Sequence, residues 1–381
     1  MKRIVTLVAS VLAAVGLIYI AWDRNGFFDS TVYYGAVKYW FRDGGMVYDW
    51  LKPETPYGFT YPPFAGLVMS PMSVLPFPVV VLLASIGTVL TVGLLVRWLA
   101  GPMLRGLGKP LWFTFGVAFA LALAFEPVRE TFSFGQVNTL LLTLVTADLL
   151  FGVARGRWWG GVGIGLATAI KLTPGVFILY LLVTRRWREA GTAIAAASAA
   201  TVLAGALFPD QSREFWTSAL WDTNRVGSLW FLSNQSERGM IARLPFDEAE
   251  SKIWLVCVLA TLAWWALRVA RAPEDVVGGL ALTGVLGCLI SPVTWIHHCV
   301  WLIPALIRCV EANRRGPAAL AAGAYAFMTS HLTWLWENRP YPPVSMLGSN
   351  IYVLFSLALL IWTPVGVRSS APAREPDKVL A

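Results

Sequence analysis

The stretch WGGVGIGLATAIKLTPGVFILYLLVT, residues 159–184, decides the fold. It is long enough for one membrane-spanning helix, since about 20 apolar residues cross a bilayer. Lys171-Leu172-Thr173-Pro174 interrupts it, and proline kinks or breaks a helix. Arginines flank the run on both sides, as is typical of cytoplasmic loops. We therefore predict two half-helices that enter from the cytoplasm and return to it, with Lys171 at the apex.

A second apolar run, residues 276–308, has the same pattern. Its interruption is the sequence SPVTWIHH, residues 291–298, and its flanks are also basic. Broken helices at membrane depth occur where they line a protein or water-filled cavity. We expect the two breaks to face one shared, outward-facing cavity.

The composition agrees with a membrane protein. Of the 381 residues, 57% are hydrophobic and 14% are charged, whereas soluble domains are about 45–50% apolar and about 25% charged. The apolar runs are continuous, which excludes the alternating segments of an outer-membrane barrel. The sequence predicts an all-α polytopic membrane protein of one domain, residues 1–381, with about twelve transmembrane segments when half-helices are counted separately.

The basic residues give the orientation. The net charge is +8, but the cations form small clusters between apolar runs, which indicates topology rather than nucleic-acid binding. We predict a multi-pass inner-membrane protein with both termini in the cytoplasm and a flexible tail at about 368–381. Two larger periplasmic loops are expected at about 22–61 and 208–250, with residues 62–76 as a short or re-entrant helix on the outer side.

Asp29 is the candidate general base. It follows the first apolar run in a segment rich in aromatic residues, Tyr33 among them, and Tyr61-Pro62-Pro63-Phe64 comes later in the same outer region. A carboxylate beside apolar groups has a pKa nearer neutrality and suits proton abstraction from a sugar hydroxyl. The alternative for Asp29 is a solvated loop acid or a helix N-cap.

Lys171 is the candidate phosphate-binding cation. A lysine within an apolar run marks a functional site by default, and an anionic ligand such as a phosphate would be its partner. The alternative is a side chain that extends to the membrane interface. His297 and His298 suit a polar or acid/base role at the cavity mouth, or a structural one. No further His or Cys is spaced to complete a metal site.

Other polar residues form the predicted substrate-binding set. Asn138, which could instead be a simple helix cap, belongs to this group, and Arg238 in the second outer loop is a second candidate for the donor phosphate. The substrate-binding candidates are Tyr33, Tyr61, Glu126, Arg129, Gln136, Asn138, Asn234, Gln235 and Trp295.

These pieces together resemble a known family. Asp29, Tyr-Pro-Pro-Phe (61–64), Gly-Gln-Val-Asn (135–138), Lys-Leu-Thr-Pro (171–174), Asn-Gln-Ser (234–236) and Ser-Pro-Val-Thr-Trp-Ile-His-His (291–298) occur in this order. The ordered set resembles the polyprenol-phosphate-mannose-dependent α-1,2-mannosyltransferases of mycobacteria and other actinobacteria. These are membrane glycosyltransferases of the C-type superfamily, and the resemblance covers nearly the whole chain.

The resemblance implies an activity. Mannose would pass from a polyprenyl-phosphate-mannose donor, with inversion and on the periplasmic side, to a mannose 2-hydroxyl of a phosphatidylinositol mannoside or lipomannan. Asp29 would take the hydroxyl proton, His297 or His298 would assist, and Lys171 would neutralise the phosphate. Some members of the superfamily use a metal held by clustered acids. No Asp-x-Asp or Glu-x-Asp pair directly follows the first helix here, so we expect neither a metal nor a cofactor.

Other functions stay open at this point. Within the same class, the chain could branch lipomannan or lipoarabinomannan, or transfer arabinofuranose from a polyprenyl-phosphate donor. From other classes, broken helices also occur in transporters and flippases, and a non-catalytic lipid-binding scaffold is a third hypothesis. A transporter would more often show internal repeats, which are not evident here.

Overall fold

The computed structural model describes residues 1–222, 225, 227–245, 249–337 and 343–366. These residues fold into helices, with one isolated β-bridge between Leu51 and Gly58 and no strand among them. The first helices are α1 (Lys2–Asn25), α2 (Phe28–Phe41), α3 (Pro63–Val68), α4 (Phe77–Leu95), α5 (Gly101–Gly106), α6 (Leu111–Ala124), α7 (Glu126–Phe134), α8 (Asn138–Ala147), α9 (Val162–Ile170) and α10 (Val176–Val183). The remaining ones are α11 (Trp187–Leu207), α12 (Pro209–Glu214), α13 (Glu237–Ala242), α14 (Glu250–Ala270), α15 (Val276–Ile290), α16 (Ile303–Glu311), α17 (Arg315–Thr329), α18 (Pro343–Ser349) and α19 (Ile351–Trp362).

The chain is a multi-pass membrane protein. By length and composition, four stretches of the described residues can cross a bilayer. These stretches are Lys2–Trp22, Phe77–Gly106, Trp187–Leu207 and Glu250–Ala270. Helices α6 and α7, bent by 65° at Phe125, form a candidate fifth span. Several shorter apolar helices pack among them, so the all-α membrane fold is confirmed, while about twelve segments stays a prediction.

Both predicted helix breaks are confirmed. Helix α9 ends at Ile170, Lys171 adopts an extended backbone (φ −147°, ψ 129°), and α10 begins only at Val176. Helix α15 ends at Ile290, and the helical path resumes as a 3₁₀ segment, Ile296–Leu302, that leads into α16. The residues between these helices are therefore free to line a cavity.

A buried carboxylate anchors the first half-helix. Asp148, at the end of α8, accepts hydrogen bonds from the backbone N–H groups of Gly161 (2.9 and 3.0 Å) and Ile164 (2.9 Å). These N–H groups open α9, where a negative charge is stabilising. Gly165 on α9 lies against the backbone of Ala193 on α11, where a side chain would collide. Helix α9 is thus fixed at its start and along one side.

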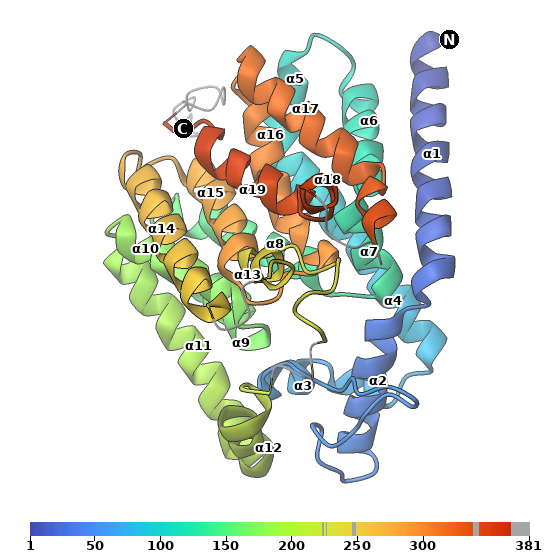
Figure 1. The fold of residues 1–381 in the computed structure, drawn as a ribbon, viewed down its shortest axis with the longest axis vertical. Helices are drawn as coiled ribbons and strands as arrows, with labels where there is room; N and C mark the ends of the chain where they lie inside the picture. The colour runs from blue at the N-terminus through green and yellow to red at the C-terminus, as the bar shows by residue number, and fades with distance from the viewer. Residues whose placement is uncertain (223–224, 226, 246–248, 338–342, 367–381) are drawn as a thin grey trace, which may run out of the picture.

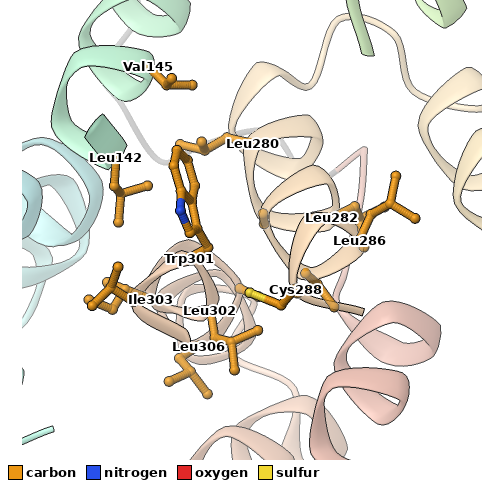
Figure 2. Close-up of a cluster of buried hydrophobic side chains, with 14 of the residues drawn as sticks. Leu142, Val145, Leu280, Leu282, Leu286, Cys288, Trp301, Leu302, Ile303 and Leu306 are labelled. Atoms are coloured by element: carbon orange, nitrogen blue, oxygen red, sulfur yellow. The ribbon is translucent and has the colours of Figure 1, made fainter. Parts of the chain in front are cut away.

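The main hydrophobic core surrounds α15. This helix is buried on nearly all sides, as expected for a helix inside a bundle. Leu142 of α8, Leu280 of α15 and Trp301 of the 3₁₀ segment meet there, with Leu302 and Leu306 below them (Figure 2). The second break is therefore held against the same core as the helices on either side of it.

The predicted outer loops contain helices. Residues 22–61 include the end of α1 and the whole of α2, and α2 packs with Tyr48, Phe59 and Tyr61 into a second buried cluster. Residues 208–250 include α12 and α13. Within 62–76 the longest helix is α3 with six residues, too short to cross a membrane. The N-terminus and α5 lie at one end of the molecule and α2, α3 and α12 at the other (Figure 1). The predicted tail, 368–381, is outside the described residues.

Candidate active site

A cavity of about 410 Å³ lies where the two breaks meet α2. Lys171, Leu172 and Thr173 come from the first break, and Ser291, Pro292, Val293, Trp295 and His298 come from the second. Asp29 and Tyr33 of α2, together with Tyr61 and Gln136, are further polar residues of the wall. The expectation of one cavity shared by both breaks is confirmed.

Asp29 is held by a chain of hydrogen bonds. Gln136 Nε2 donates to Asp29 Oδ2 at 2.7 Å, and Gln136 Oε1 accepts from the Tyr61 hydroxyl at 2.9 Å. Tyr33 and Tyr61 share a further hydroxyl–hydroxyl bond of 2.8 Å. Because a tyrosine hydroxyl donates to its oxygen, the Gln136 amide is oriented with its N–H toward Asp29. No hydrogen bond within the described residues engages Oδ1 of Asp29.

A glycine turn places Gln136 beside Asp29. Gly135 ends α7 in the left-handed region, at φ 69° and ψ 44°, where glycine is favoured. Its carbonyl accepts from the hydroxyl of Ser30 (2.9 Å), the residue next to Asp29, and a side chain at position 135 would collide with Ser30. The sequence Gly135-Gln136 therefore docks the end of α7 onto the start of α2.

The surroundings of Asp29 suit a base. Burial in the cavity raises the pKa of Asp29 to about 6, and the hydrogen bond from Gln136 limits that rise. A carboxylate with such a pKa is ionised at neutral pH and is more basic than an ordinary aspartate.

Lys171 lies in the same cavity. Its Nζ lies 3.0 Å from Asn138 Oδ1 and 2.8 Å from His298 Nε2, and it lies above the ring of Tyr61 at 5.1 Å from the centroid. The side chain is 9% exposed, so it faces the cavity rather than the membrane interface. Asn138, at the start of α8, is thereby a direct partner of Lys171.

The two neighbouring histidines have different positions. His298 lines the cavity, and its Nδ1 accepts from the backbone N–H of Trp295 at 3.1 Å. His297 is not among the cavity-lining residues and packs against the ring of Phe134, with centroids 5.3 Å apart. Of the pair, His298 is the one in a position to meet a ligand.

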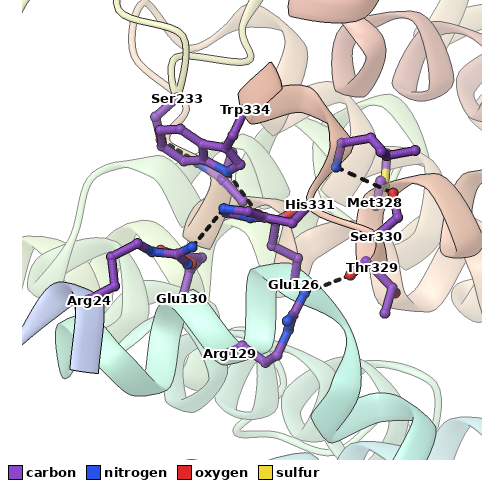
Figure 3. Close-up of polar contacts among 12 residues, drawn as sticks. Arg24, Glu126, Arg129, Glu130, Ser233, Met328, Thr329, Ser330, His331 and Trp334 are labelled. Atoms are coloured by element: carbon purple, nitrogen blue, oxygen red, sulfur yellow. Dashed lines mark hydrogen bonds and ion pairs between the residues drawn. The ribbon is translucent and has the colours of Figure 1, made fainter. Parts of the chain in front are cut away.

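Glu126 and Arg129 belong to a separate polar cluster outside the cavity. Glu126 accepts from Trp334 Nε1 at 2.9 Å and from the Tyr352 hydroxyl at 2.5 Å, and it pairs with His331. Arg129 donates to the backbone carbonyl of Thr329 at 2.8 Å. Figure 3 shows how these side chains join α7 to the segment that follows α17. In this arrangement they hold helices together.

The same cluster contains a group of side chains that could hold a metal ion. Ligand atoms of Glu126, Glu130 and His331 lie within 4.8 Å of one another. Each of them is already engaged, however, because Arg24 contacts both Glu130 and His331 while His331 pairs with Glu126 (Figure 3). A guanidinium bound to two of the three side chains disfavours a second cation, so this donor set does not fit a metal ion.

Asn234 and Gln235 do not line the cavity and instead form hydrogen bonds with Thr294 of the second break. Asn234 Oδ1 accepts from Thr294 N–H at 2.9 Å, and its Nδ2 donates to the carbonyl of Leu229 at 2.9 Å. Gln235 is buried and donates to the carbonyls of Leu232 and Ser349. Arg238 pairs with Glu250 across 3.5 Å and does not line the cavity.

The chain has relatives among known proteins. Residues 59–292, more than half of the sequence, match the glycosyltransferase family 87 model.

The chain belongs to glycosyltransferase family 87.

The relatives agree with this family. The polyprenol-phosphate-mannose-dependent α-(1-2)-phosphatidylinositol pentamannoside mannosyltransferase of Mycolicibacterium smegmatis is 34% identical over 93% of this chain and 89% of its own length. A corresponding phosphatidylinositol mannoside mannosyltransferase of Mycobacterium tuberculosis is 33% identical over 94% and 90%. An α-(1→3)-arabinofuranosyltransferase of M. tuberculosis is 30% identical over 78% and 69%. No solved structure matches the chain.

This member of family 87 is therefore a glycosyltransferase, and the predicted resemblance is confirmed. The family favours an enzyme over the transporter and scaffold hypotheses. A glycosyltransferase needs a base for the acceptor hydroxyl and a means of stabilising the leaving group. The cavity offers Asp29 for the first and Lys171 with His298 for the second.

Sequence reasoning missed several residues at the cavity. Arg225 and Asp222 of the second outer region line it, as do Phe28 and Tyr57. Arg225 donates to the carbonyl of Tyr48 at 2.6 Å and pairs with Asp222. The candidates predicted in residues 208–250 were Asn234, Gln235 and Arg238, and the one sequence signal for the missed pair is the spacing of an acid and a base, Asp222 and Arg225.

Proposed function

We propose that this chain transfers mannose from a polyprenyl-phosphate-mannose donor to a mannose 2-hydroxyl of a phosphatidylinositol mannoside. The product linkage is α-1,2, and the anomeric centre is inverted. The observation that carries the proposal is the cavity, which combines the Asp29 carboxylate, whose pKa is raised, with a buried Lys171–His298 pair. The chain is also similar, over more than 90% of its length, to two mannosyltransferases with this donor and acceptor class.

Asp29 is the base in this proposal. As the acceptor oxygen bonds to the anomeric carbon, its proton passes to Asp29, and the bond from that carbon to the phosphate oxygen breaks. Oδ2 stays with Gln136, so Oδ1 is the oxygen that takes the proton. Positioned proton transfer of this kind is worth about 10²–10⁴-fold in rate.

Lys171 and His298 stabilise the departing polyprenyl phosphate. The leaving group gains one negative charge as the glycosidic bond breaks, and donors already in place for that charge lower the barrier. Asn138 positions the Lys171 amine from behind. Tyr33, Tyr61 and Trp295 supply aromatic surface of the kind that sugar rings pack against.

The reaction faces the periplasm, and the N-terminus lies in the cytoplasm. Support comes from the arrangement in Figure 1, where the N-terminus, with Lys2 and Arg3, and α5, with Arg105, are at the end of the molecule opposite α2. Basic clusters favour the cytoplasmic side, and α1, which separates this end from Asp29, is long and apolar enough to cross a bilayer.

The test uses the purified chain in detergent with defined substrates. Mannosyl and arabinofuranosyl donors on the same polyprenyl phosphate are each offered with phosphatidylinositol mannosides or with lipomannan. Transfer of mannose to a phosphatidylinositol mannoside, with an α-1,2 linkage by NMR, is the expected result. Transfer of arabinose alone, or of mannose to lipomannan alone, would overturn the proposed substrates.

A further inference from the structure

The hydrogen bonds around His298 fix its protonation state. Its Nδ1 accepts from the backbone N–H of Trp295 at 3.1 Å, and a nitrogen that accepts carries no proton. His298 is therefore the neutral tautomer with its proton on Nε2, because the imidazolium form would put a proton on both nitrogens.

That tautomer has a consequence for Lys171. The Nε2–H of His298 faces Nζ of Lys171 at 2.8 Å. An ammonium group has three donors and no acceptor, so it cannot accept this hydrogen bond. A neutral amine can, because its nitrogen carries a lone pair.

The other side of Lys171 is compatible with an amine. Nζ donates to Oδ1 of Asn138 at 3.0 Å, and Nδ2 of Asn138 donates in turn to the carbonyl of His297 at 3.3 Å. The amide orientation of Asn138 is thereby set. The bonds run in one direction from the backbone of Trp295 through His298, Lys171 and Asn138, and each bond pairs one donor with one acceptor.

The titratable groups that face Lys171 are few. His298 is bonded to it, with His297 behind at a ring distance of 4.6 Å. The Tyr61 ring lies beneath the amine, with Tyr33 bonded to Tyr61, and Asp29 lines the same cavity. Asp29 is the only one of these groups that carries a charge at pH 8, since its pKa is about 6.

We infer that Lys171 is a neutral amine in this hydrogen-bond arrangement, and that binding of the anionic phosphodiester donor is coupled to uptake of one proton from solvent by Lys171. In this step the Lys171 amine takes up one proton and becomes an ammonium group, and the donor anion binds beside it. Once Lys171 is an ammonium, its Nζ can no longer accept a hydrogen bond from His298 Nε2–H. The two groups then both present N–H donors to each other, and the hydrogen bond between them breaks. His298 Nε2–H then turns to the phosphate, so that both groups donate to the anion.

The inference rests on the proposed donor, and calorimetry tests the two separately. Polyprenyl-phosphate-mannose is titrated into the full-length protein at pH 8, without acceptor, in buffers of different ionisation enthalpy. The slope of the binding enthalpy against that ionisation enthalpy gives the protons taken up. We expect about one, because the phosphodiester does not titrate in this range.

Two variants locate the proton. Asp29→Asn removes the charged carboxylate among the groups named above as facing Lys171 and should still take up about one proton. Lys171→Arg carries a guanidinium that stays protonated and should bind the donor with no uptake. Binding by the wild type without proton uptake, or equal uptake by Lys171→Arg, would overturn the inference while the proposed donor stands. Absence of donor binding by the wild type would overturn the proposed donor and the inference with it.

Discussion

Replacing Gln136 by leucine should move the acid limb of the pH–rate profile to higher pH. Gln136 donates to Oδ2 of Asp29 across 2.7 Å in a buried setting. Its N–H stabilises the ionised carboxylate and so lowers the pKa of Asp29, which is about 6 with this bond in place. In the proposed mechanism the enzyme is active only when Asp29 is ionised, so the rate should be lost as the pH falls through that pKa.

The size of the shift follows from the bond. A hydrogen bond to a charged group contributes about 1.5–3 kcal/mol, and about 1.4 kcal/mol corresponds to one pKa unit. Gln136→Leu should therefore raise the limb by about one to two units, toward pH 7 to 8. The assay is kcat/KM for mannose transfer between pH 5 and 9, with acceptor saturating.

Gln211→Leu is the matched control. Gln211 is as buried as Gln136, 8% against 7% exposed, but its Oε1 accepts from the backbone N–H of Val47 and does not contact Asp29. This variant should keep the wild-type limb whatever its effect on stability. If Gln136→Leu also keeps the wild-type limb, or shifts it to lower pH, the reasoning about Asp29 is refuted.

Substitutions at three other positions have defined outcomes. Lys171→Met should lower kcat/KM about 10²–10³-fold because the leaving phosphate loses a hydrogen-bond donor. Lys171→Arg should retain part of the rate. Equal initial rates for Lys171→Met and wild type would contradict this prediction. Asp148→Ala leaves the N–H groups of Gly161 and Ile164 without their acceptor and should reduce the free energy of unfolding by about 1–3 kcal/mol. A lower melting temperature with an unchanged donor KM is expected, and an unchanged melting temperature would argue against the cap. Gly135→Ala should reduce kcat through displacement of Gln136, since position 135 has φ 69° and no room for a side chain; wild-type kcat would contradict that role.

The sequence predicted those parts of the site that are determined by residues close together in the chain, namely the two helix breaks and the position of Asp29. Lys171 with Pro174 predicted the first break because a cation and a proline both conflict with a continuous apolar helix. The position of Asp29 directly after the first apolar run identified the candidate base. The second break followed from Pro292 in the same way.

Partners distant in sequence could not be predicted. Gln136 and Asp29 are separated by 107 positions, and Glu126 and His331 by 205. Gln136 and Glu126 are both polar residues between two apolar runs, so the sequence pattern does not distinguish them. In the structure Gln136 lines the cavity, whereas Glu126 lies in a separate buried polar cluster. Helix α2 was missed because a hydropathy pattern distinguishes membrane from water and not helix from loop outside the membrane.

The most direct test of the account is mannose transfer by the Asp29→Asn variant. Asparagine can accept the bond from Gln136 as aspartate does, so the change removes the base and keeps the site. With purified protein and saturating polyprenyl-phosphate-mannose, kcat should fall about 10²–10⁴-fold, while donor affinity and the activity of the exposed control Asp43→Asn stay at wild-type values. Asp29→Asn that transfers mannose at the wild-type rate would contradict the account.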